Sequence, residues 1–365
     1  KNTILAVIMK ILFRTDASVE IGSGHLMRCL TLADQLRNEG AEVAFICRDL
    51  PGGMFDLLLT RGYRFAKLPL GKAGKASQQF DAEETIKAAG QLFPVMFNWL
   101  VVDHYQLDAT WERLLRPHAD KLMVIDDLAN RPHDCDLLLD QNYYREMERR
   151  YQGLVSAECV SLLGPEFVLL RPEFAVARQN IRERDGIVTR ILIFFGGSDP
   201  ENLTLKVIEA TQRLQRPDIA VDVVVGSSNP HRAEIRERCE HMPNTTYYCQ
   251  VTNMAELMGR ADLAIGAGGA TMWERCFLGL PSITVVFSAN QEKTTIDVAA
   301  EKGIKYFGWA RQLEVQDYVD AIRWMISSPD KMREMADNAL RLMGGKVSAG
   351  TLAVTIAMLD EVNAE

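Results

Sequence analysis

The sequence predicts an α/β protein that carries two parallel β-sheets in tandem. Short apolar runs rich in β-branched residues alternate with amphipathic helical stretches, which is the pattern of repeated βα units. The length of 365 residues exceeds one ordinary domain and suits two. Open parallel sheets bind ligands where their strands run into helices, so two such sheets suggest a cleft between them.

Apolar runs predict the strands, and the amphipathic stretches between them predict the helices. The expected strands are Ile11–Phe13, Val43–Cys47, Arg64–Leu68, Trp99–Val102, Leu122–Ile125, Leu137–Leu139, Arg190–Phe195, Val221–Val225, Thr246–Tyr248, Leu263–Ile265 and Ser282–Val285. The expected helices are Leu26–Asn38, Met54–Arg61, Ala82–Gln91, Ala109–His118, Leu203–Leu214, Arg232–His241, Met254–Gly259, Thr271–Leu278, Gln291–Lys302, 315–327, 330–343 and Ala349–Val362.

A highly charged stretch, Arg171–Gly186, is interpreted as the connection between two domains. The first domain is expected at residues 9–180 and the second at residues 187–345, with residues 346–365 packing back on the first. The segment before Met9 is apolar but short and has no cleavage site, so Met9 is interpreted as the natural start.

The composition narrows the function classes. A net charge of −8 argues against broad binding to nucleic acids or anionic membranes. Apolar runs stay short of the roughly 18 residues that a membrane span needs. The seven cysteines show neither CxxC pairs nor zinc spacing, which indicates reduced thiols in a cytoplasm. We expect a cytoplasmic monomer that acts on a small molecule.

The loop after the first strand, Arg14 to His25, is the first candidate site. Gly22 and Gly24 permit tight turns or close approach of a ligand, and the loop leads into a helix N-terminus, which favours anions. It gives only weak support for a dinucleotide site, because a third glycine is missing and Arg48 follows the second strand where an acid is needed.

His25 stands at the start of the helix that follows this loop. The positive end of the helix dipole favours the neutral imidazole, which accepts a proton in general-base catalysis. Asp16 is expected to orient the ring. The alternative is a histidine that caps the helix or is satisfied in a polar loop. His104 also follows a strand, whereas four other histidines are interpreted as structural: His118, His133, His231 and His241.

Two glycine turns follow strands in the second half. Gly196 and Gly197 can expose N–H groups to a phosphate, although Ser198 and Asp199 can equally serve only to cap the next helix.

The second glycine turn is the stronger signal. The amides of Gly268, Gly269 and Ala270, with the Thr271 hydroxyl, can hold a diphosphate at a helix N-terminus. Glu274, one turn into that helix, can accept both hydroxyls of a ribose, and its alternative is a favourable interaction with the helix dipole. This combination is typical of nucleotide-sugar proteins.

Four segments resemble a known family: RTDASVEIGSGHLMRCLTLA, LLGPEFVLLRPEF, FFGGSDPEN and IGAGGATMWERCFLGLP. They are similar to segments of the UDP-2,4-diacetamido-2,4,6-trideoxy-β-L-altropyranose hydrolases of pseudaminic acid biosynthesis, over nearly the whole chain from Met9. The resemblance implies an α/β, GT-B-like fold, in which two Rossmann-like domains face a central cleft with their parallel sheets and the second holds most of the nucleotide.

The resemblance also implies roles for individual residues, with His25 as the catalytic base. The implied UDP contacts are Gly268, Gly269, Thr271, Glu274 on the ribose, and the backbone near Gln250 and Val251, to which the first glycine turn adds Gly196 and Gly197. The implied substrate contacts are Tyr105 and Asn290, with Arg14, Asp16 and Gly24 from the N-terminal signature. Neither a metal nor a cofactor is implied.

The implied reaction is cleavage of the sugar C1–O bond with inversion. UDP leaves as a stable anion, so one base and a set of amides suffice without the acid of ordinary inverting glycosidases. The alternatives are a GT-B glycosyltransferase, a non-catalytic nucleotide-sugar binding protein, and an epimerase of the same fold. Carboxylate-rich loops typical of such epimerases are not identified in the first half.

Overall fold

The chain forms two compact α/β units. The structure is a computed structural model that describes residues 8–18, 20–71, 77–93, 96–197, 199–344 and 350–363. The first unit comprises the chain up to Asn142, Glu146–Leu169 and the segment from Gly350, and the second comprises Tyr143–Arg145 and Leu170–Ala349. Within the described ranges, no helix combines the length and the apolarity that crossing a membrane requires.

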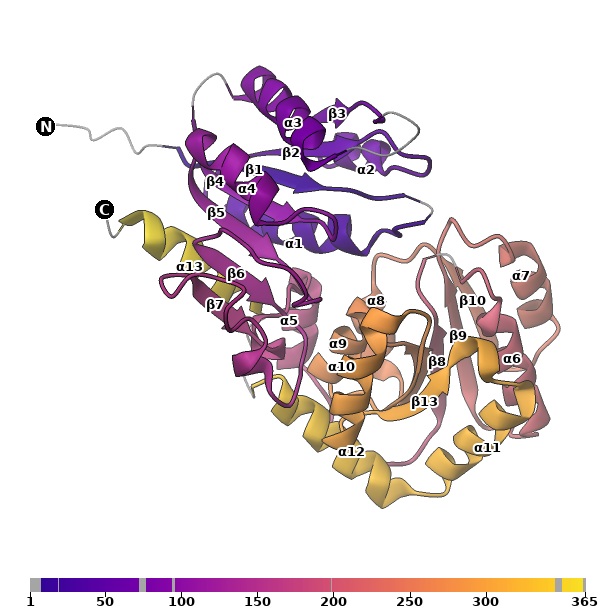
Figure 1. Ribbon diagram of the computed structural model, residues 1–365. Helices are drawn as coiled ribbons and strands as arrows, with labels where there is room; N and C mark the ends of the chain where they lie inside the picture. Colours follow the sequence, from indigo (N-terminus) through magenta and orange to yellow (C-terminus); the bar gives the residue numbers. More distant parts are fainter. Residues whose placement is uncertain are drawn as a thin grey trace, which may run out of the picture. The chain divides into compact units, whose positions relative to one another are not determined.

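The first unit contains a seven-stranded parallel sheet in the order β3-β2-β1-β4-β5-β6-β7 (Figure 1). Its strands are β1 (Lys10–Thr15), β2 (Glu42–Arg48), β3 (Arg64–Leu68), β4 (Phe97–Asp103), β5 (Ala119–Ile125), β6 (Leu137–Asp140) and β7 (Val160–Leu163). Its helices are α1 (Gly24–Asn38), α2 (Phe55–Thr60), α3 (Gln78–Leu92), α4 (Ala109–Leu115) and α13 (Gly350–Asn363).

The second unit contains a six-stranded parallel sheet in the order β10-β9-β8-β11-β12-β13. Its strands are β8 (Arg190–Phe194), β9 (Ala220–Val225), β10 (Thr245–Cys249), β11 (Leu263–Ala267), β12 (Ser282–Val286) and β13 (Lys305–Trp309). Its helices are α5 (Pro172–Gln179), α6 (Leu203–Arg213), α7 (Arg232–Glu240), α8 (Met254–Arg260), α9 (Ala270–Phe277), α10 (Ala289–Ala300), α11 (Val315–Ile326) and α12 (Pro329–Leu342).

Both sheets reverse their strand order at one place. β1 lies between β2 and β4, with Thr15 beside Asp103, and β8 lies between β9 and β11, with Phe194 beside Gly266. At such a switch point the loops that leave the two central strands diverge to opposite faces of the sheet and open a crevice at the carboxyl ends. The topology therefore singles out the loops after β1 and β4, and those after β8 and β11.

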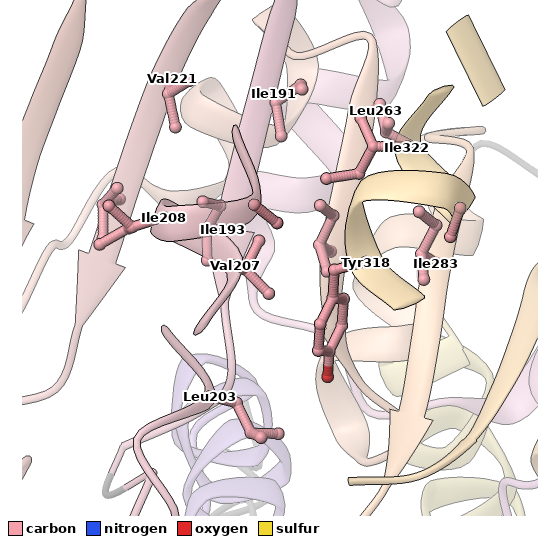
Figure 2. Packing of buried hydrophobic residues seen from close by; sticks show 14 of the residues in the cluster. Ile191, Ile193, Leu203, Val207, Ile208, Val221, Leu263, Ile283, Tyr318 and Ile322 are labelled. Carbon is pink, nitrogen blue, oxygen red and sulfur yellow. The ribbon is translucent and has the colours of Figure 1, made fainter. Parts of the chain in front are cut away.

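Apolar side chains on both faces hold the sheets against their helices. The strands read as nearly continuous apolar runs, as expected for parallel strands that are covered on both sides. In the second unit, β-branched and leucine side chains of four strands pack against α6 and α11 (Figure 2). The labelled members are Ile191, Ile193, Val221, Leu263 and Ile283 of the sheet, with Leu203, Val207, Ile208, Tyr318 and Ile322 of the helices.

Three elements were not expected from the sequence. β7 is an edge strand with exposed or half-buried side chains, and β13 is half-buried along its length, so neither shows an apolar run. α5 lies in the charged stretch that was interpreted as a connection, and its one buried side chain is Phe174. Because α5 packs on α8 and α9, the chain passes between the units at Leu169 and Leu170, earlier than expected.

A buried ion-pair network fixes the loop between β1 and α1. The fully buried Arg14 donates to Asp16 Oδ1 at 2.6 Å and to Asp81 Oδ2 at 2.7 Å. Arg48 also donates to Asp81, and Trp111 Nε1 donates to Asp81 Oδ1 at 2.9 Å. Burial alone raises the pKa of Asp81, but the positive charges of Arg14 and Arg48 outweigh this effect and lower the pKa to about 2.

Replacing Asp81 tests this network. Asp81→Asn is expected to lower the free energy of unfolding at pH 7 by about 3 kcal/mol, because it leaves the buried Arg14 with too few acceptors. The pKa of Asp81 is lower in the folded state than in the unfolded state. Its contribution to the free energy of unfolding is therefore present above about pH 4 and is lost as the pH falls toward 2. Urea unfolding at pH 7 and pH 3 measures both effects. The exposed Asp218→Asn serves as the control, and an Asp81→Asn midpoint equal to wild type at pH 7 contradicts the prediction.

Candidate functional site

The loops after β1 and β4 bring His25 and a carboxylate together. Asp103, the last residue of β4, places its Oδ1 2.5 Å from Nδ1 of His25, the second residue of α1. His25 keeps 8% of its surface exposed and Asp103 keeps 1%. The imidazole is thus held by an acid on the strand that adjoins β1 across the switch point.

Arg28, one turn further along α1, keeps the carboxylate of this pair ionised. Its Nε donates to Asp103 Oδ2 at 2.5 Å and its Nη2 donates to Oδ1 at 2.7 Å, a bidentate clamp. Against the effect of burial, Arg28 and His25 hold the pKa of Asp103 well below its usual range. Because Asp103 is ionised, Nδ1 of His25 is the nitrogen that donates to it, and in the neutral imidazole the lone pair then lies on Nε2.

Nε2 of His25 makes no hydrogen bond to any residue that the structure describes. His104 is the opposite case. Its Nδ1 accepts from the backbone N–H of Gln106 at 3.1 Å and its Nε2 donates to Asp16 Oδ2 at 3.0 Å, so both ring nitrogens are engaged. Of these two neighbouring histidines, His25 is therefore the one that is able to accept a proton from a ligand.

The expectation that Asp16 orients His25 is wrong. Asp16 Oδ1 accepts from Arg14 and from the backbone N–H of Arg48 at 2.7 Å, while its Oδ2 accepts from His104. Arg14 has no exposed surface, so Arg14 and Asp16 position the β1–α1 loop and leave no group for a ligand. Gly24 is the first residue of α1, where a Cβ would meet nothing within 4 Å.

Tyr105 packs its ring edge-to-face against His25, with centroids 4.4 Å apart. Burial and the nearby Asp127 carboxylate raise the pKa of Tyr105, so its hydroxyl stays protonated. Arg28 Nη1 also donates to Asp127 Oδ2 at 3.2 Å. Tyr105, Arg28 and Asp127 therefore surround the His25–Asp103 pair.

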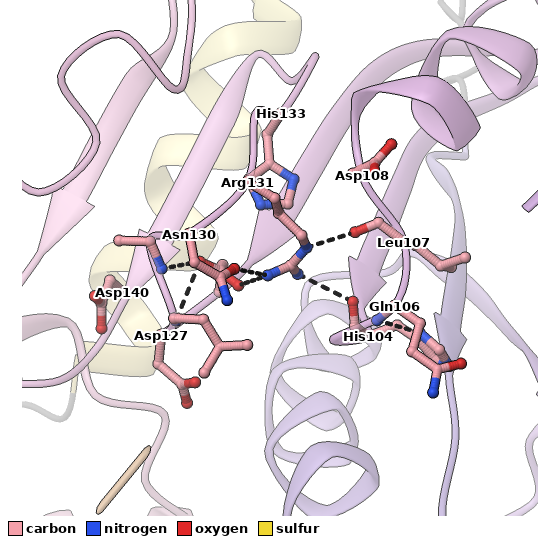
Figure 3. Close-up of polar contacts among 12 residues, drawn as sticks. His104, Gln106, Leu107, Asp108, Asp127, Asn130, Arg131, His133 and Asp140 are labelled. Atoms are coloured by element: carbon pink, nitrogen blue, oxygen red, sulfur yellow. Dashed lines mark hydrogen bonds and ion pairs between the residues drawn. The ribbon is translucent and has the colours of Figure 1, made fainter. Parts of the chain in front are cut away.

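Arg131 fastens the loop after β4 to the loop after β5 (Figure 3). Its Nε donates to the Leu107 carbonyl at 2.8 Å, its Nη2 donates to the His104 carbonyl at 3.1 Å, and it pairs with Asp126 at 2.7 Å. The backbone that carries Tyr105 is thereby held from outside its own loop.

Carboxylates gather at the ends of three neighbouring strands, contrary to the expectation that the first half lacks carboxylate-rich loops. They are Asp103 after β4, Asp126 and Asp127 after β5, and Asp140 on β6. The Tyr151 hydroxyl lies 3.0 Å from Asp126 Oδ2 and 3.1 Å from Asp140 Oδ2, and burial raises the pKa of Asp140 to about 7. The sequence pattern missed this group because its members follow three different strands, which only the pairing of those strands brings together.

In the second unit, the turn between β11 and α9 brings bare backbone to the carboxyl edge of the sheet. A Cβ on Gly268 would approach Thr295 Oγ1 to 2.5 Å, and one on Gly266 would collide with the Phe194 carbonyl. Gly269 is the N-cap of α9, and the first amides of a helix have no intrahelical acceptor. The turn is therefore tightly constrained and suited to an anion.

Arg275 lies beneath this turn without a carboxylate in ion-pair contact among the described residues. It is 1% exposed, and its Nη2 donates to the Ala267 carbonyl at 2.8 Å while its Nη1 donates to Thr271 Oγ1 at 3.3 Å. Burial lowers the pKa of Arg275 to about 10, so it still carries its charge at neutral pH. A positive charge without an ion-pair partner at this place, beneath the N-terminus of α9, strengthens the site for an anion.

Glu274 has a hydrogen-bond donor among the described residues for only one of its two carboxylate oxygens. Its Oε1 accepts from Arg171 Nη2 at 3.1 Å, while its Oε2 is buried without a hydrogen-bond partner in the described part of the chain. Burial raises the pKa of Glu274. A buried acceptor without a donor is costly, so a ligand hydroxyl that reaches Oε2 is stabilised there.

The remaining predicted UDP contacts lie at the carboxyl edge of the same sheet. Gly196 follows β8 with a φ of 95°, and the Gly197 carbonyl accepts from Ser228 Oγ at 2.9 Å. Val251 follows Gln250, whose side chain accepts from the Ser227 amide at 3.1 Å. Asn290, a predicted substrate contact, lies in the first turn of α10 and accepts from Ser288 Oγ at 2.5 Å.

After the first glycine turn, Ser198 and Asp199 were alternatively expected only to cap the next helix, and Asp199 does so. Asp199 accepts from the backbone N–H groups of Leu203 and Thr204, each at 2.9 Å, and so caps α6. Ser198 lies outside the described residues.

Two Rossmann-like units with parallel sheets define a GT-B fold, as expected. Residues 191–347 match the Glycosyltransferase family 28 C-terminal domain. The crystal structure of Acinetobacter baumannii MurG superposes with a TM-score of 0.65 over 96% of this chain and 99% of that chain, at 14% identity, a likeness of fold alone.

Relatives in sequence confirm the resemblance that the motifs indicated. The chain is 27% identical over 287 residues to the UDP-2,4-diacetamido-2,4,6-trideoxy-β-L-altropyranose hydrolase of Campylobacter jejuni, covering 78% of this chain and 94% of the relative. It is 34% identical over 143 residues to the spore coat polysaccharide biosynthesis protein SpsG of Bacillus subtilis, covering 38% of this chain and 41% of the relative. These similarities support a function connected with nucleotide sugars.

The hydrogen-bond pattern predicts opposite tautomers for two neighbouring histidines. In ¹⁵N–¹H correlation spectra of the neutral imidazoles, His25 is expected to be protonated on Nδ1 and His104 on Nε2. Asp103→Asn should change the His25 spectrum, because an amide is able to donate to Nδ1, and should leave the His104 spectrum as it is. Protonation of His25 on Nε2 in the wild type overturns the assignment.

Proposed function

We propose that the chain hydrolyses a UDP-linked 2,4-diacetamido-2,4,6-trideoxy sugar at C1, with inversion, and releases UDP and the free sugar in pseudaminic acid biosynthesis. The observation that carries this proposal is the orientation of His25, with Nδ1 engaged by Asp103 and a lone pair left on Nε2. The activity for which the Campylobacter jejuni relative is named supports the choice of sugar.

In the proposed reaction, Nε2 of His25 takes a proton from a water molecule while the water oxygen attacks C1. The C1–O bond to UDP breaks on the opposite face, and UDP leaves as an anion that needs no acid. Asp103 stabilises the imidazolium that forms, and the Arg28 clamp keeps the proton from passing to Asp103. Tyr105 and Asn290 remain the proposed sugar contacts.

The second unit supplies the proposed UDP site. The amides of Gly269 and Ala270 and the Thr271 hydroxyl hold the diphosphate, with the charge of Arg275 beneath them. The Gly268 amide is not among these donors, because it already donates to the Val285 carbonyl at 2.8 Å. Glu274 Oε2 accepts from the ribose hydroxyls. Gly196, Gly197 and Val251 complete the proposed contacts.

His25→Asn tests the base. The variant is expected to lose about 10³-fold in kcat, because an amide does not accept the water proton, while its UDP affinity stays within about twofold of wild type. UDP release measured with the UDP-sugar substrate, and UDP titration calorimetry, report the two quantities. The exposed His241→Asn is the matched control. A His25→Asn enzyme that keeps near-normal kcat removes His25 from the mechanism.

A panel of UDP-sugars, with products read by NMR, separates the proposal from its alternatives. Hydrolysis gives UDP and free sugar of inverted anomeric configuration when no acceptor is present. A glycosyltransferase needs an added acceptor, an epimerase yields an epimeric sugar, and a binding protein turns over none of them.

Glu274→Gln tests the ribose contact. The wild type is expected to bind UDP about tenfold more tightly than 2′,3′-dideoxy-UDP, because only the hydroxyls satisfy Glu274 Oε2. The variant should lose most of this discrimination while its affinity for inorganic pyrophosphate stays unchanged. Equal discrimination by the two proteins rules out a Glu274–ribose contact.

A further inference from the structure

Two cysteine sulfurs of the first unit lie in contact. Cys135 precedes β6 and Cys159 precedes β7, and the pairing of Leu137 with Val160 brings the starts of these strands side by side. The Sγ atoms of Cys135 and Cys159 are 3.6 Å apart. No other pair among the seven cysteines, all of which the structure describes as free thiols, shows such a contact.

The two thiols differ in a way that suits stepwise oxidation. Cys135 is 5% exposed, whereas Cys159 is partly exposed and follows the exposed residues 156–158. The hydrogen bond with Cys135 lowers the pKa of Cys159, and the same contact together with burial raises the pKa of Cys135. The accessible sulfur is thus the one that more readily forms a thiolate, the reactive form.

We propose that Cys135 and Cys159 form an oxidant-responsive site that is closed into a disulfide by hydrogen peroxide. The Cys159 thiolate attacks one peroxide oxygen, the O–O bond breaks, and Cys159 becomes a sulfenic acid. The departing hydroxide takes up the proton that the Cys159 thiol released on ionising and becomes water. The Cys135 sulfur then attacks the Cys159 sulfur, the S–O bond breaks, and the departing hydroxide takes the Cys135 proton as a second water. Two thiols lose two electrons, and the peroxide gains them.

The disulfide would close a loop that supports the carboxylate group near His25. Between the two cysteines, Tyr151 hydrogen-bonds to Asp126 and Asp140, and Arg150 Nη2 donates to the Asp127 carbonyl at 2.8 Å. Closing residues 135–159 restricts the freedom of this segment in partly unfolded states. The oxidised segment therefore opens less often than the reduced one.

The test is oxidation of the folded full-length chain. After treatment with a slight excess of hydrogen peroxide, non-reducing tryptic digestion and mass spectrometry should find one intramolecular link, Cys135–Cys159, that dithiothreitol reverses. Cys135→Ser should instead trap Cys159 as a sulfenic acid, detected with a dimedone probe. Hydrogen–deuterium exchange across residues 136–158 should slow at least threefold in the oxidised protein.

Two controls isolate the effect of the fold. Cys249→Ser, at an exposed cysteine, should form the link as wild type does. Wild type that is oxidised in urea should give mixed pairs. The proposal is overturned by Cys135 and Cys159 remaining free in the native protein, by other pairs forming as readily, or by exchange across residues 136–158 that does not change on oxidation.

Discussion

Asp103 carries a negative charge at the end of a strand covered on both faces, and this charge has to be compensated where it lies. α1 supplies both partners, because His25 and Arg28 stand one turn apart on the same helix face. Once Arg28 holds the carboxylate, its remaining nitrogen reaches Asp127, and Tyr105 packs on the imidazole. The orientation of His25 is thus a consequence of how the first sheet neutralises one buried acid.

The second unit uses the opposite electrostatic arrangement. Arg275 is buried without an acid in ion-pair contact among the described residues, and its donors go to the Ala267 carbonyl and to Thr271. Its charge and the α9 dipole act in the same direction at the glycine turn, where Gly269 is the N-cap of the helix. The first unit therefore holds the proposed base beside a neutralised acid, while the second holds a buried positive charge beneath the proposed diphosphate site.

The sequence predicted the sheets well because parallel strands are apolar on both faces, and β1, β2 and β11 each stand out as such runs. It located the His25 loop and the Gly268 turn, which are continuous in the chain. It assigned Asp16 instead of Asp103 as the partner of His25, because proximity in sequence favoured the nearer acid. Asp103 ends the strand beside β1, so a prediction of strand order would have found it. The buried state of Arg14, Arg275 and Glu274 depends on packing that no local pattern reports.

α13 belongs to the first unit although the chain reaches it only after completing the second. Its Val354 and Met358 are fully buried in the cluster that contains Leu26 and Leu30 of α1, the helix that carries His25. During synthesis from the N-terminus, α1 lacks its last packing partners until the whole second sheet has been made. The unit that begins first is therefore the one that finishes last, and the apolar side chains of α1 that Val354 and Met358 cover lack these partners throughout that interval.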